Sequence, residues 1–232
     1  MLFRFLKFNW PTLTQKGGFT ILEMLVVIAI IVIMTGVLLN NLPSFRDSTT
    51  LQLVAQEVAT TIRSSQVFGI GTRVSQSTSF LGHGMYFCAP TNPACKKTFV
   101  LFTDNNNNKY FDQADSFKSG GNWKDSCGVG ASDPNNECGE LYNLVGNIEV
   151  CSISTNLEAE ASVLSVTFSR LYPDAFIYTT LPEANAGAVQ ADYADIYLRS
   201  IKENKQRKIR IYNTGAITVE GVDAADNHCP IT

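Results

Sequence analysis

Residues 16–39 read KGGFTILEMLVVIAIIVIMTGVLL, an almost uninterrupted apolar run. From Phe19 to Leu39 the only charged residue is Glu23. About 20 predominantly apolar residues suffice for a helix that crosses the hydrocarbon core of a bilayer. A carboxylate at the centre of that core costs about 2.5–3.5 kcal/mol on insertion scales. The run therefore predicts a membrane-embedded helix in which Glu23 either lies at the membrane edge or finds a partner outside its own helix.

The charges around this run indicate an orientation. Residues 1–18 contain Arg4, Lys7 and Lys16 and no acidic residue, which favours a cytoplasmic N-terminus with the rest of the chain outside. Over the whole chain the net charge is −3 and 17% of residues are charged. This balance excludes a protein coated in basic residues for general nucleic-acid binding.

Two common interpretations of such a segment explain it incompletely. A cleaved secretory signal has an apolar region of about 7–15 residues followed by a small-residue cleavage site. Here the run is longer, and the sequence LLNNLPSFRDS that follows contains no Ala-x-Ala pattern. An ordinary signal anchor is physically adequate. Neither interpretation explains Glu23 or the two glycines that precede Phe19.

Gly18-Phe19-Thr20-x-x-Glu23, followed by a long apolar helix, resembles the N-terminal motif of type IV prepilins and type II secretion pseudopilins. In that family a membrane peptidase cuts after the glycine, here Gly18, and methylates the new amino terminus, here Phe19. The resemblance implies a leader peptide at 1–18. It also implies that residues 19–39 form a transmembrane helix that later enters a filament core.

The resemblance also implies a partner for Glu23. In the family this carboxylate pairs with the terminal amine of a neighbouring subunit during assembly. The amine does not exist until the leader has been removed, so the precursor cannot form the pair. A buried pair can fix the register between helices. The alternative is an interfacial glutamate that merely reaches the membrane surface.

Partners and location follow from the same resemblance. It implies a prepilin peptidase and methylase, other pilin or pseudopilin subunits, an inner-membrane assembly platform, and membrane lipid before assembly. The chain would cross the cytoplasmic membrane once with its C-terminal domain outside, and would then join an extracytoplasmic or cell-surface filament.

Beyond the membrane run, the pattern predicts an α+β domain. In residues 40–71 an apolar stripe at helical spacing predicts the amphipathic half of the same helix, which Gly69 and Gly71 end; its members are Leu51, Val54, Ala55, Val58 and Ile62. Residues 72–232 contain eight short segments rich in β-branched and aromatic residues, namely 84–89, 97–104, 144–153, 162–169, 174–180, 194–201, 207–213 and 215–221. Residues 118–140 and 181–192 are interpreted as loops. We expect the helix to pack against an antiparallel sheet with disulfide-tied loops.

Three phrases of the domain resemble the GspH/FimT-type subgroup of minor pilins and pseudopilins: VAQEVATTIRSSQ, FVLFTDNNNNKYFD and IRIYNTGAITV. The subgroup implies a minor pilin or pseudopilin of a type II secretion pseudopilus or a type IV pilus. Some of its members take part in DNA uptake, so a DNA-binding minor pilin of a competence pilus is the alternative.

A basic run is the only sequence feature that favours DNA; its members are Lys202, Lys205, Arg207, Lys208 and Arg210. A solvated hairpin or a docking face for an acidic neighbour explains the run equally well. DNA-binding relatives carry their basic residues after the last strand, where this chain has the acidic VDAADNHCPIT. DNA is therefore not an expected partner.

All six cysteines follow the apolar run, which suits disulfides in an oxidising compartment. Six cysteines allow fifteen pairings. The simplest set joins the cysteines that bracket turn-like stretches, Cys88 to Cys95 and Cys127 to Cys138, and leaves Cys151 to tie a strand to Cys229 in the tail. Because there is no CxxC pair, a structural zinc site is poorly supported.

The stretch DNNNNKYFDQAD, residues 104–115, has the spacing of a calcium loop. The oxygen-bearing positions 1, 3, 5, 7, 9 and 12 of such a loop fall on Asp104, Asn106, Asn108, Tyr110, Asp112 and Asp115. Lys109 stands at the sixth position, where a glycine is expected, and the last ligand is Asp rather than Glu. Calcium is thus a candidate cofactor, and a polar β-turn is the alternative.

No motif indicates catalysis. The two histidines, His83 and His228, lie outside any nucleophile pattern, and the sequence has no phosphate-binding loop. We therefore expect a structural assembly subunit and not an enzyme.

Overall fold

The computed structural model describes residues 18–71, 82–88, 96–111, 137–170, 173–179, 190–202, 205–222 and 228–229. Within these ranges the chain forms one α-helix and nine β-strands: α1 Ile21–Ile70, β1 Gly82–Cys88, β2 Thr98–Asp104, β3 Cys138–Asn143, β4 Ile148–Thr155, β5 Val163–Phe168, β6 Ala175–Tyr178, β7 Tyr193–Ser200, β8 Gln206–Tyr212 and β9 Ile217–Gly221. The chain divides into two compact units, Met1–Pro43 and Ser44–Thr232.

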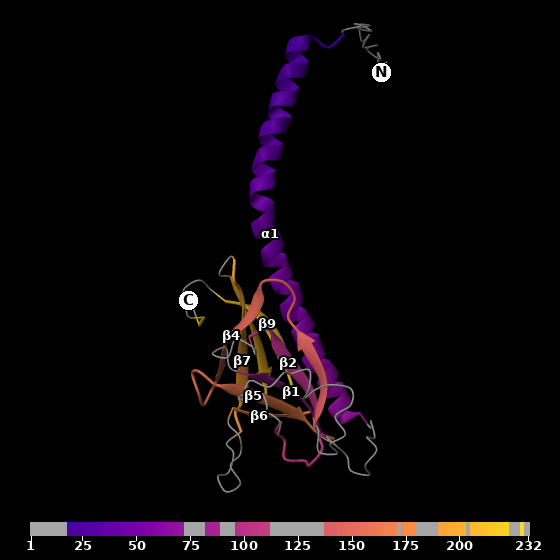
Figure 1. The fold of residues 1–232 in the computed structure, drawn as a ribbon, viewed down its shortest axis with the longest axis vertical. Coiled ribbons are helices and arrows are strands. Elements are labelled where there is room, and N and C mark those ends of the chain that lie inside the picture. Colours follow the sequence, from indigo (N-terminus) through magenta and orange to yellow (C-terminus); the bar gives the residue numbers. More distant parts are fainter. Residues whose placement is uncertain are drawn as a thin grey trace, which may run out of the picture. The chain divides into compact units, whose positions relative to one another are not determined.

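The strands form two antiparallel sheets (Figure 1). One sheet has the order β3-β2-β1-β5-β6, and the other has the order β4-β7-β8-β9. In the second sheet consecutive strands β7, β8 and β9 pair as a meander. In the first sheet β5 pairs with β1, which lies far from it in sequence.

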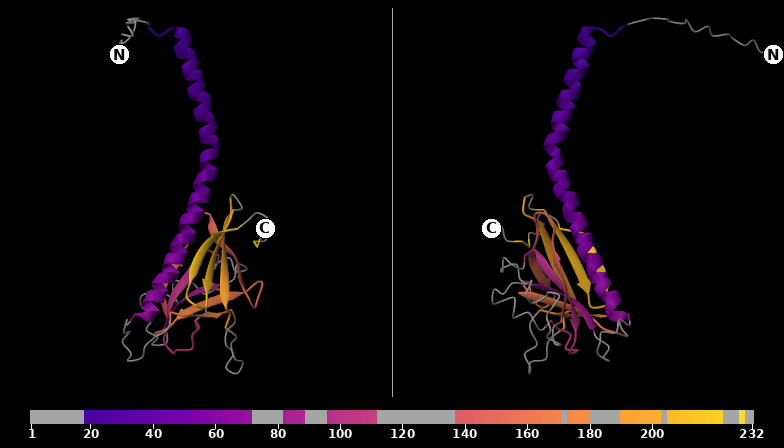
Figure 2. Two further views of the ribbon diagram at one scale, coloured as in Figure 1. Left: turned by 180° about the vertical axis from the view of Figure 1, so that it is seen from behind. Right: turned by 45° about the vertical axis from the view of Figure 1, so that its right-hand side comes forward.

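Both sheets share one hydrophobic core with the helix segment that begins at Ser44 (Figure 2). The helix contributes the predicted stripe, and each of its five members is no more than 3% exposed, which confirms that part of the prediction. The strands contribute alternate residues, because successive side chains of a strand point to opposite faces. Core members of this kind are Met85 and Phe87 in β1 and Ala194, Ile196 and Leu198 in β7.

Strand β4 contains an irregularity that keeps its apolar side chains on the core face. Its register against β7 shifts between Val150 and Ser152, so that Cys151 is the extra residue. Strict alternation from Val150 would turn Ile153 away from the core. The bulge corrects this phase, because an extra residue reverses the alternation beyond it. Val150 and Ile153 both lie in the core, and Cys151 lies outside it with Tyr197 and Cys229.

The five-stranded sheet is also covered on its other face. Tyr86 of β1 and Phe102 of β2 point away from the helix, yet both are buried. They pack against Phe111, which follows β2, with ring centroids 5.0 Å and 5.2 Å away respectively. Two apolar faces explain why β1 reads as a continuous apolar run rather than as an alternating one.

The end of the helix is tied to both sheets. The side-chain amide of Gln66 donates hydrogen bonds to the carbonyls of Pro173, before β6, and of Gly215, before β9. Arg63 donates to the carbonyl of Ile217 at 3.2 Å. At Gly69 any Cβ would collide with the backbone of Phe168 in β5, so the helix can approach this strand only with glycine at that position.

The α+β architecture agrees with the sequence prediction, with two corrections. All eight predicted strands are present, but they divide between two sheets rather than forming one. The prediction also placed residues 138–140 in a loop, whereas they begin β3. Strand β3 escapes the pattern because Gly139 and Glu140 are exposed and its apolar residues are only half-buried.

We predict that Ile62→Ala lowers the free energy of unfolding by about 2–4 kcal/mol, because it leaves a cavity in the shared core. The side chain of Ile62 is 0% exposed. The matched control is Val67→Ala on the same helix, whose side chain is 66% exposed and which should cost less than about 0.5 kcal/mol. Thermal unfolding of the full-length chain in detergent measures both. Equal losses would contradict the burial pattern.

Candidate functional site

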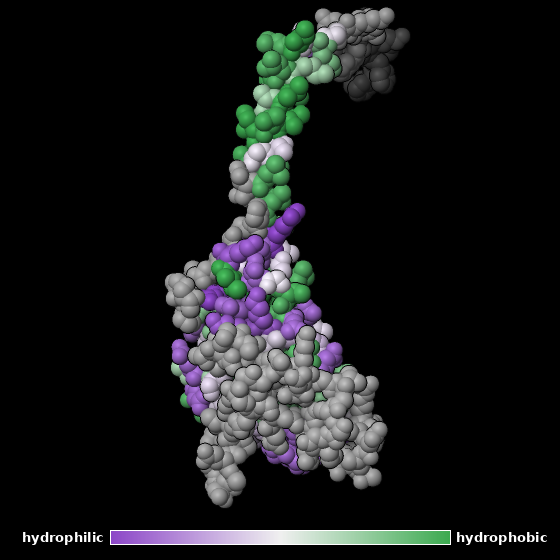
Figure 3. All heavy atoms as spheres, in the orientation of Figure 1, coloured by the Kyte–Doolittle hydropathy of each residue, from purple (hydrophilic) through white to green (hydrophobic). Residues whose placement is uncertain are grey.

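The first candidate site is the apolar N-terminal part of α1. Ile21–Leu39 is 19 residues long with a mean hydropathy of 2.9, which is sufficient in length and composition to cross a membrane. Every side chain from Phe19 to Leu39 is exposed. Figure 3 shows the corresponding surface as hydrophobic. A helix that is apolar all round needs an apolar environment on every side.

The helix begins at a local cap. The hydroxyl of Thr20 accepts a hydrogen bond from the backbone N–H of Glu23 at 3.2 Å. The carbonyl of Thr20 accepts the first helical hydrogen bond, from Met24. Thr20 is therefore the N-cap, and Glu23 occupies the third helical position, as in the capping-box sequence. A carboxylate in the first turn is also favoured by the helix dipole.

The cap leaves the predicted cleavage point outside the helix. Gly18 and Phe19 precede the first helical residue and are exposed, Phe19 by 76%. The bond between them therefore lies in a non-helical segment. A new amine at Phe19 would begin one residue before the N-cap, in the same first turn region as Glu23. The remaining leader residues, 1–17, lie outside the described residues.

Two of the five residues in the predicted basic run pair with acidic residues. Arg210 binds Asp195 through two hydrogen bonds of 2.7 Å and 2.6 Å, and Lys208 forms an ion pair with Glu220 at 2.8 Å. The hydrogen bond between the latter two side chains raises the pKa of Lys208 and lowers that of Glu220.

Strand alternation places neighbouring members of the run on different faces of the four-stranded sheet. Lys208 lies opposite Tyr197 on the outer face of the four-stranded sheet. Arg207 lies opposite the buried Leu198, which places it on the other face. Lys202 and Lys205 are exposed between β7 and β8. The strand period therefore separates cations that are adjacent in sequence, and acidic partners neutralise two of them.

One predicted disulfide lies wholly within the described residues. Cys151 is bonded to Cys229, with their Cα atoms 5.3 Å apart. This is the strand-to-tail pair of the predicted set. Cys88 and Cys138 are also disulfide-bonded. Their predicted partners, Cys95 and Cys127, lie outside the described residues, so those two pairings stay predictions.

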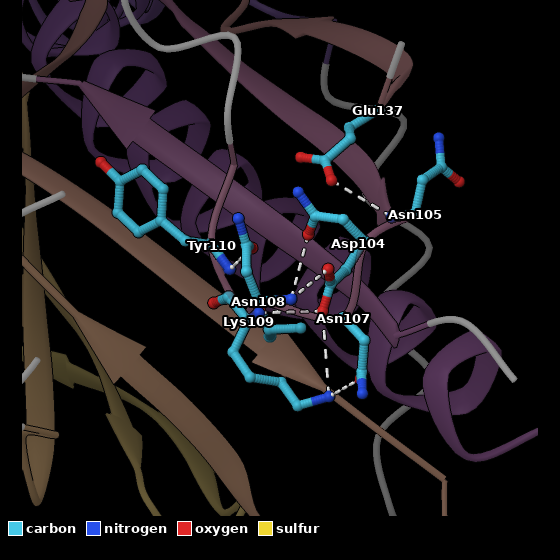
Figure 4. Close-up of polar contacts among 9 residues, drawn as sticks. Asp104, Asn105, Asn107, Asn108, Lys109, Tyr110 and Glu137 are labelled. Carbon is cyan, nitrogen blue, oxygen red and sulfur yellow. Dashed lines mark hydrogen bonds and ion pairs between the residues drawn. The ribbon is translucent and has the colours of Figure 1, made fainter. Parts of the chain in front are cut away.

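The polar loop after β2 is a compact turn built around the carboxylate of Asp104 (Figure 4). This side chain is 0% exposed and accepts hydrogen bonds from the backbone N–H groups of Asn108 and Lys109, both at 3.0 Å. The side-chain oxygen of Asn106 accepts from the Asn108 N–H, and that of Asn108 accepts from the Tyr110 N–H. Burial raises the pKa of Asp104 above its usual value, and these hydrogen bonds oppose the shift.

The sequence allowed two interpretations of this loop, a calcium site and a polar β-turn. The hydrogen bonds described above are those of a polar turn. Asp104, Asn106 and Asn108 each accept a backbone N–H, as short polar side chains do in turns. Among the described residues no group of three or more His, Cys, Asp or Glu side chains is arranged to hold a metal ion. Asp112 and Asp115 lie outside the described residues. These contacts alone therefore do not test the calcium hypothesis from the sequence.

Sequence reasoning missed three features that the structure supplies. Thr20 is a cap, and the T-x-x-E spacing that signals it was present. Asp195 and Glu220 pair with the basic run, and their place on the same face follows from strand alternation once the register is known. Lys109 was noted only as a departure from the calcium pattern, and no spacing rule shows where its side chain lies.

Comparison with known families gives one match. Residues 13–39 match the model of the prokaryotic N-terminal methylation motif. This range includes Gly18, Phe19, Thr20 and Glu23 and ends with the apolar run. No curated protein and no solved structure matches the chain.

We predict the remaining disulfides as Cys88–Cys95 and Cys127–Cys138. Both pairs close short loops, which is the simplest pairing available once Cys151 is joined to Cys229. Peptide mapping of the protein under non-reducing conditions should find the two local pairs together with Cys151–Cys229. A peptide that joins Cys88 to Cys127 would contradict this set.

Proposed function

We propose that this chain, whose N-terminal segment carries the methylation motif of type IV pilins and pseudopilins, is a minor pilin or pseudopilin. In this proposal it is a structural subunit and not an enzyme. A prepilin peptidase removes residues 1–18 and methylates Phe19. The mature subunit is then assembled into a type II secretion pseudopilus or a type IV pilus.

One observation carries the proposal: the helical segment Ile21–Leu39 is apolar and exposed on all sides, and its only charge lies in the first turn, shortly after a non-helical Gly-Phe bond. A simple anchor would need neither the carboxylate nor the exposed bond. Packing the segment among identical or similar helices would bury its apolar surface at about 25 cal/mol per Å². Lipid serves the same purpose before assembly.

In this proposal Glu23 sets the register in which neighbouring helices pack. A charge among packed apolar helices is costly unless an opposite charge meets it. Cleavage after Gly18 creates such a charge, the terminal amine of Phe19. Because Glu23 faces outward from its own helix, the amine of a neighbouring subunit can reach it. Register between subunits then depends on one ion pair that the uncleaved precursor cannot make.

The proposal includes a location and partners. The precursor sits in the cytoplasmic membrane as a single-pass protein with its β-sheet domain outside. Its partners are the peptidase and methylase, the assembly platform of the inner membrane, and other pilin or pseudopilin subunits. The assembled subunit belongs to an extracytoplasmic or cell-surface filament.

The DNA-uptake alternative gains no support from the described residues. A DNA-binding face needs cations that gather on one surface and remain available to phosphates. Here Arg210 and Lys208 already bind Asp195 and Glu220, and Arg207 lies on the opposite face of the sheet. We therefore keep the structural role as the proposal.

We predict that mature protein begins at Phe19. Mass spectrometry of the N-terminal peptide should show loss of residues 1–18 and a methyl group on the new amine. In this proposal the peptidase recognises Gly18, so Gly18→Ala should block the cleavage. An intact Met1 terminus in assembled material would contradict the proposed processing.

We predict that Glu23→Ala separates processing from assembly. The variant should be cleaved as wild type, because Gly18 and Phe19 are unchanged, but should enter filaments poorly, because the amine of the next subunit lacks its counter-ion. Quantifying the subunit in sheared or purified filaments measures the loss, for which we expect at least about tenfold, or about 1.4 kcal/mol.

Glu57→Ala is the matched control, since Glu57 is an exposed acid of the same helix outside the apolar run. It should be cleaved and assembled normally. Assembly of Glu23→Ala at the wild-type level would remove the role given to Glu23.

A further inference from the structure

The loop 104–110 contains a positive charge of its own. The Nζ atom of Lys109 lies 3.9 Å from Oδ2 of Asp104 and also hydrogen-bonds the side-chain oxygen of Asn107. It lies 5.5 Å from the centroid of the Phe176 ring in β6, within the range of a cation–π contact. A carboxylate, an amide oxygen and an aromatic face thus surround the ammonium group.

The carboxylate that faces this ammonium is among the most deeply buried acids of the described chain. Asp104 is 0% exposed, and a buried carboxylate is stable only if hydrogen bonds and an opposite charge compensate its lost hydration. Two backbone N–H groups supply the hydrogen bonds. The ammonium of Lys109, whose side chain is 19% exposed, supplies the opposite charge.

The backbone holds the lysine in place. Lys109 has φ 68° and Asn107 has φ 62°, both in the left-handed region that favours glycine. A lysine in this conformation is less favourable than a glycine, so another interaction must compensate. The carbonyl of Lys109 accepts a hydrogen bond from the hydroxyl of Thr167 in β5 at 2.9 Å, which anchors the turn to the sheet.

From this geometry we propose that the ammonium of Lys109 takes the place of a divalent cation in this loop. The loop has the oxygen spacing of a calcium loop, and its sixth position has the left-handed backbone that a glycine provides there. Instead of glycine and a bound ion, this chain uses a lysine that brings the charge on its own side chain. The loop therefore keeps its shape without a metal, and the inference does not depend on the proposed assembly function.

The test compares three forms of the full-length chain in detergent by thermal unfolding, with either a chelator or millimolar calcium chloride present. In Lys109→Met the side chain keeps its length and loses its charge. Without calcium its melting temperature should fall by about 2–4 °C or more, because Asp104 loses its counter-ion. Wild type should melt at the same temperature in both solutions.

Lys109→Gly supplies the third form. It removes the ammonium and suits the left-handed backbone, so a cation can take the place of the ammonium beside Oδ2 of Asp104 and the side-chain oxygen of Asn107. Its melting temperature should rise with calcium by about 2–4 °C or more, as expected when a ligand binds only the folded state. Lys202→Ala is the matched control, because Lys202 is exposed in the turn before β8, and it should show no response to calcium.

Each outcome decides the proposal. A calcium-dependent rise in the wild-type melting temperature would overturn it and favour a true calcium loop. An unchanged melting temperature in Lys109→Met would show that Asp104 does not need the ammonium. If Lys109→Gly fails to fold, Lys109→Asn replaces it, since asparagine tolerates the same backbone conformation. Absence of a calcium response in the glycine or asparagine form that folds would also overturn the proposal.

Discussion

The structure depends on one helix, α1, whose two halves need different environments. Between residues 21 and 39 the side chains of α1 are apolar on every face, and between 51 and 62 one apolar stripe is buried. The stripe has its partner in the chain, since both sheets pack against it. The apolar part has none within the described residues. In the proposed function, membrane lipid and then neighbouring helices supply that partner.

Much of this arrangement could be predicted because it follows from local periodicity. The helical stripe and eight strands are visible in the sequence, since burial on one face leaves a period of 3.6 or 2. The division into two sheets is not visible, because it depends on which strands pair across long sequence distances. Strand β3 was missed because its side chains are half-exposed and contain little periodic signal. The bulge at Cys151 shows the same limit, since only the register against β7 reveals it.

The basic run at residues 202–210 shows that local composition alone does not predict a basic surface. Five basic residues within nine positions suggest a basic surface, yet strand alternation sends neighbours to opposite faces. Two of the five, Arg210 and Lys208, have acidic partners on other strands, Asp195 in β7 and Glu220 in β9. The N-terminal motif behaves differently. Thr20 is the N-cap and Glu23 lies three residues further on, so their relation is local, and the T-x-x-E spacing signals it although the sequence analysis did not use it.

The loop after β2 lies between these two cases. Its hydrogen bonds are local, and spacing alone identified Asp104, Asn106 and Asn108 as oxygen ligands of a calcium ion or, alternatively, as members of a polar turn. Spacing could not choose between them, because both use the same oxygens and the same left-handed residue. The choice between a turn and an ion site depends on whether a metal ion or the ammonium group of Lys109 lies near Asp104. The sequence does not show where the Lys109 side chain lies. In the sequence, Lys109 is only a departure from a metal-binding pattern. In the structure, its ammonium group lies beside the buried carboxylate of Asp104 and acts as its counter-ion.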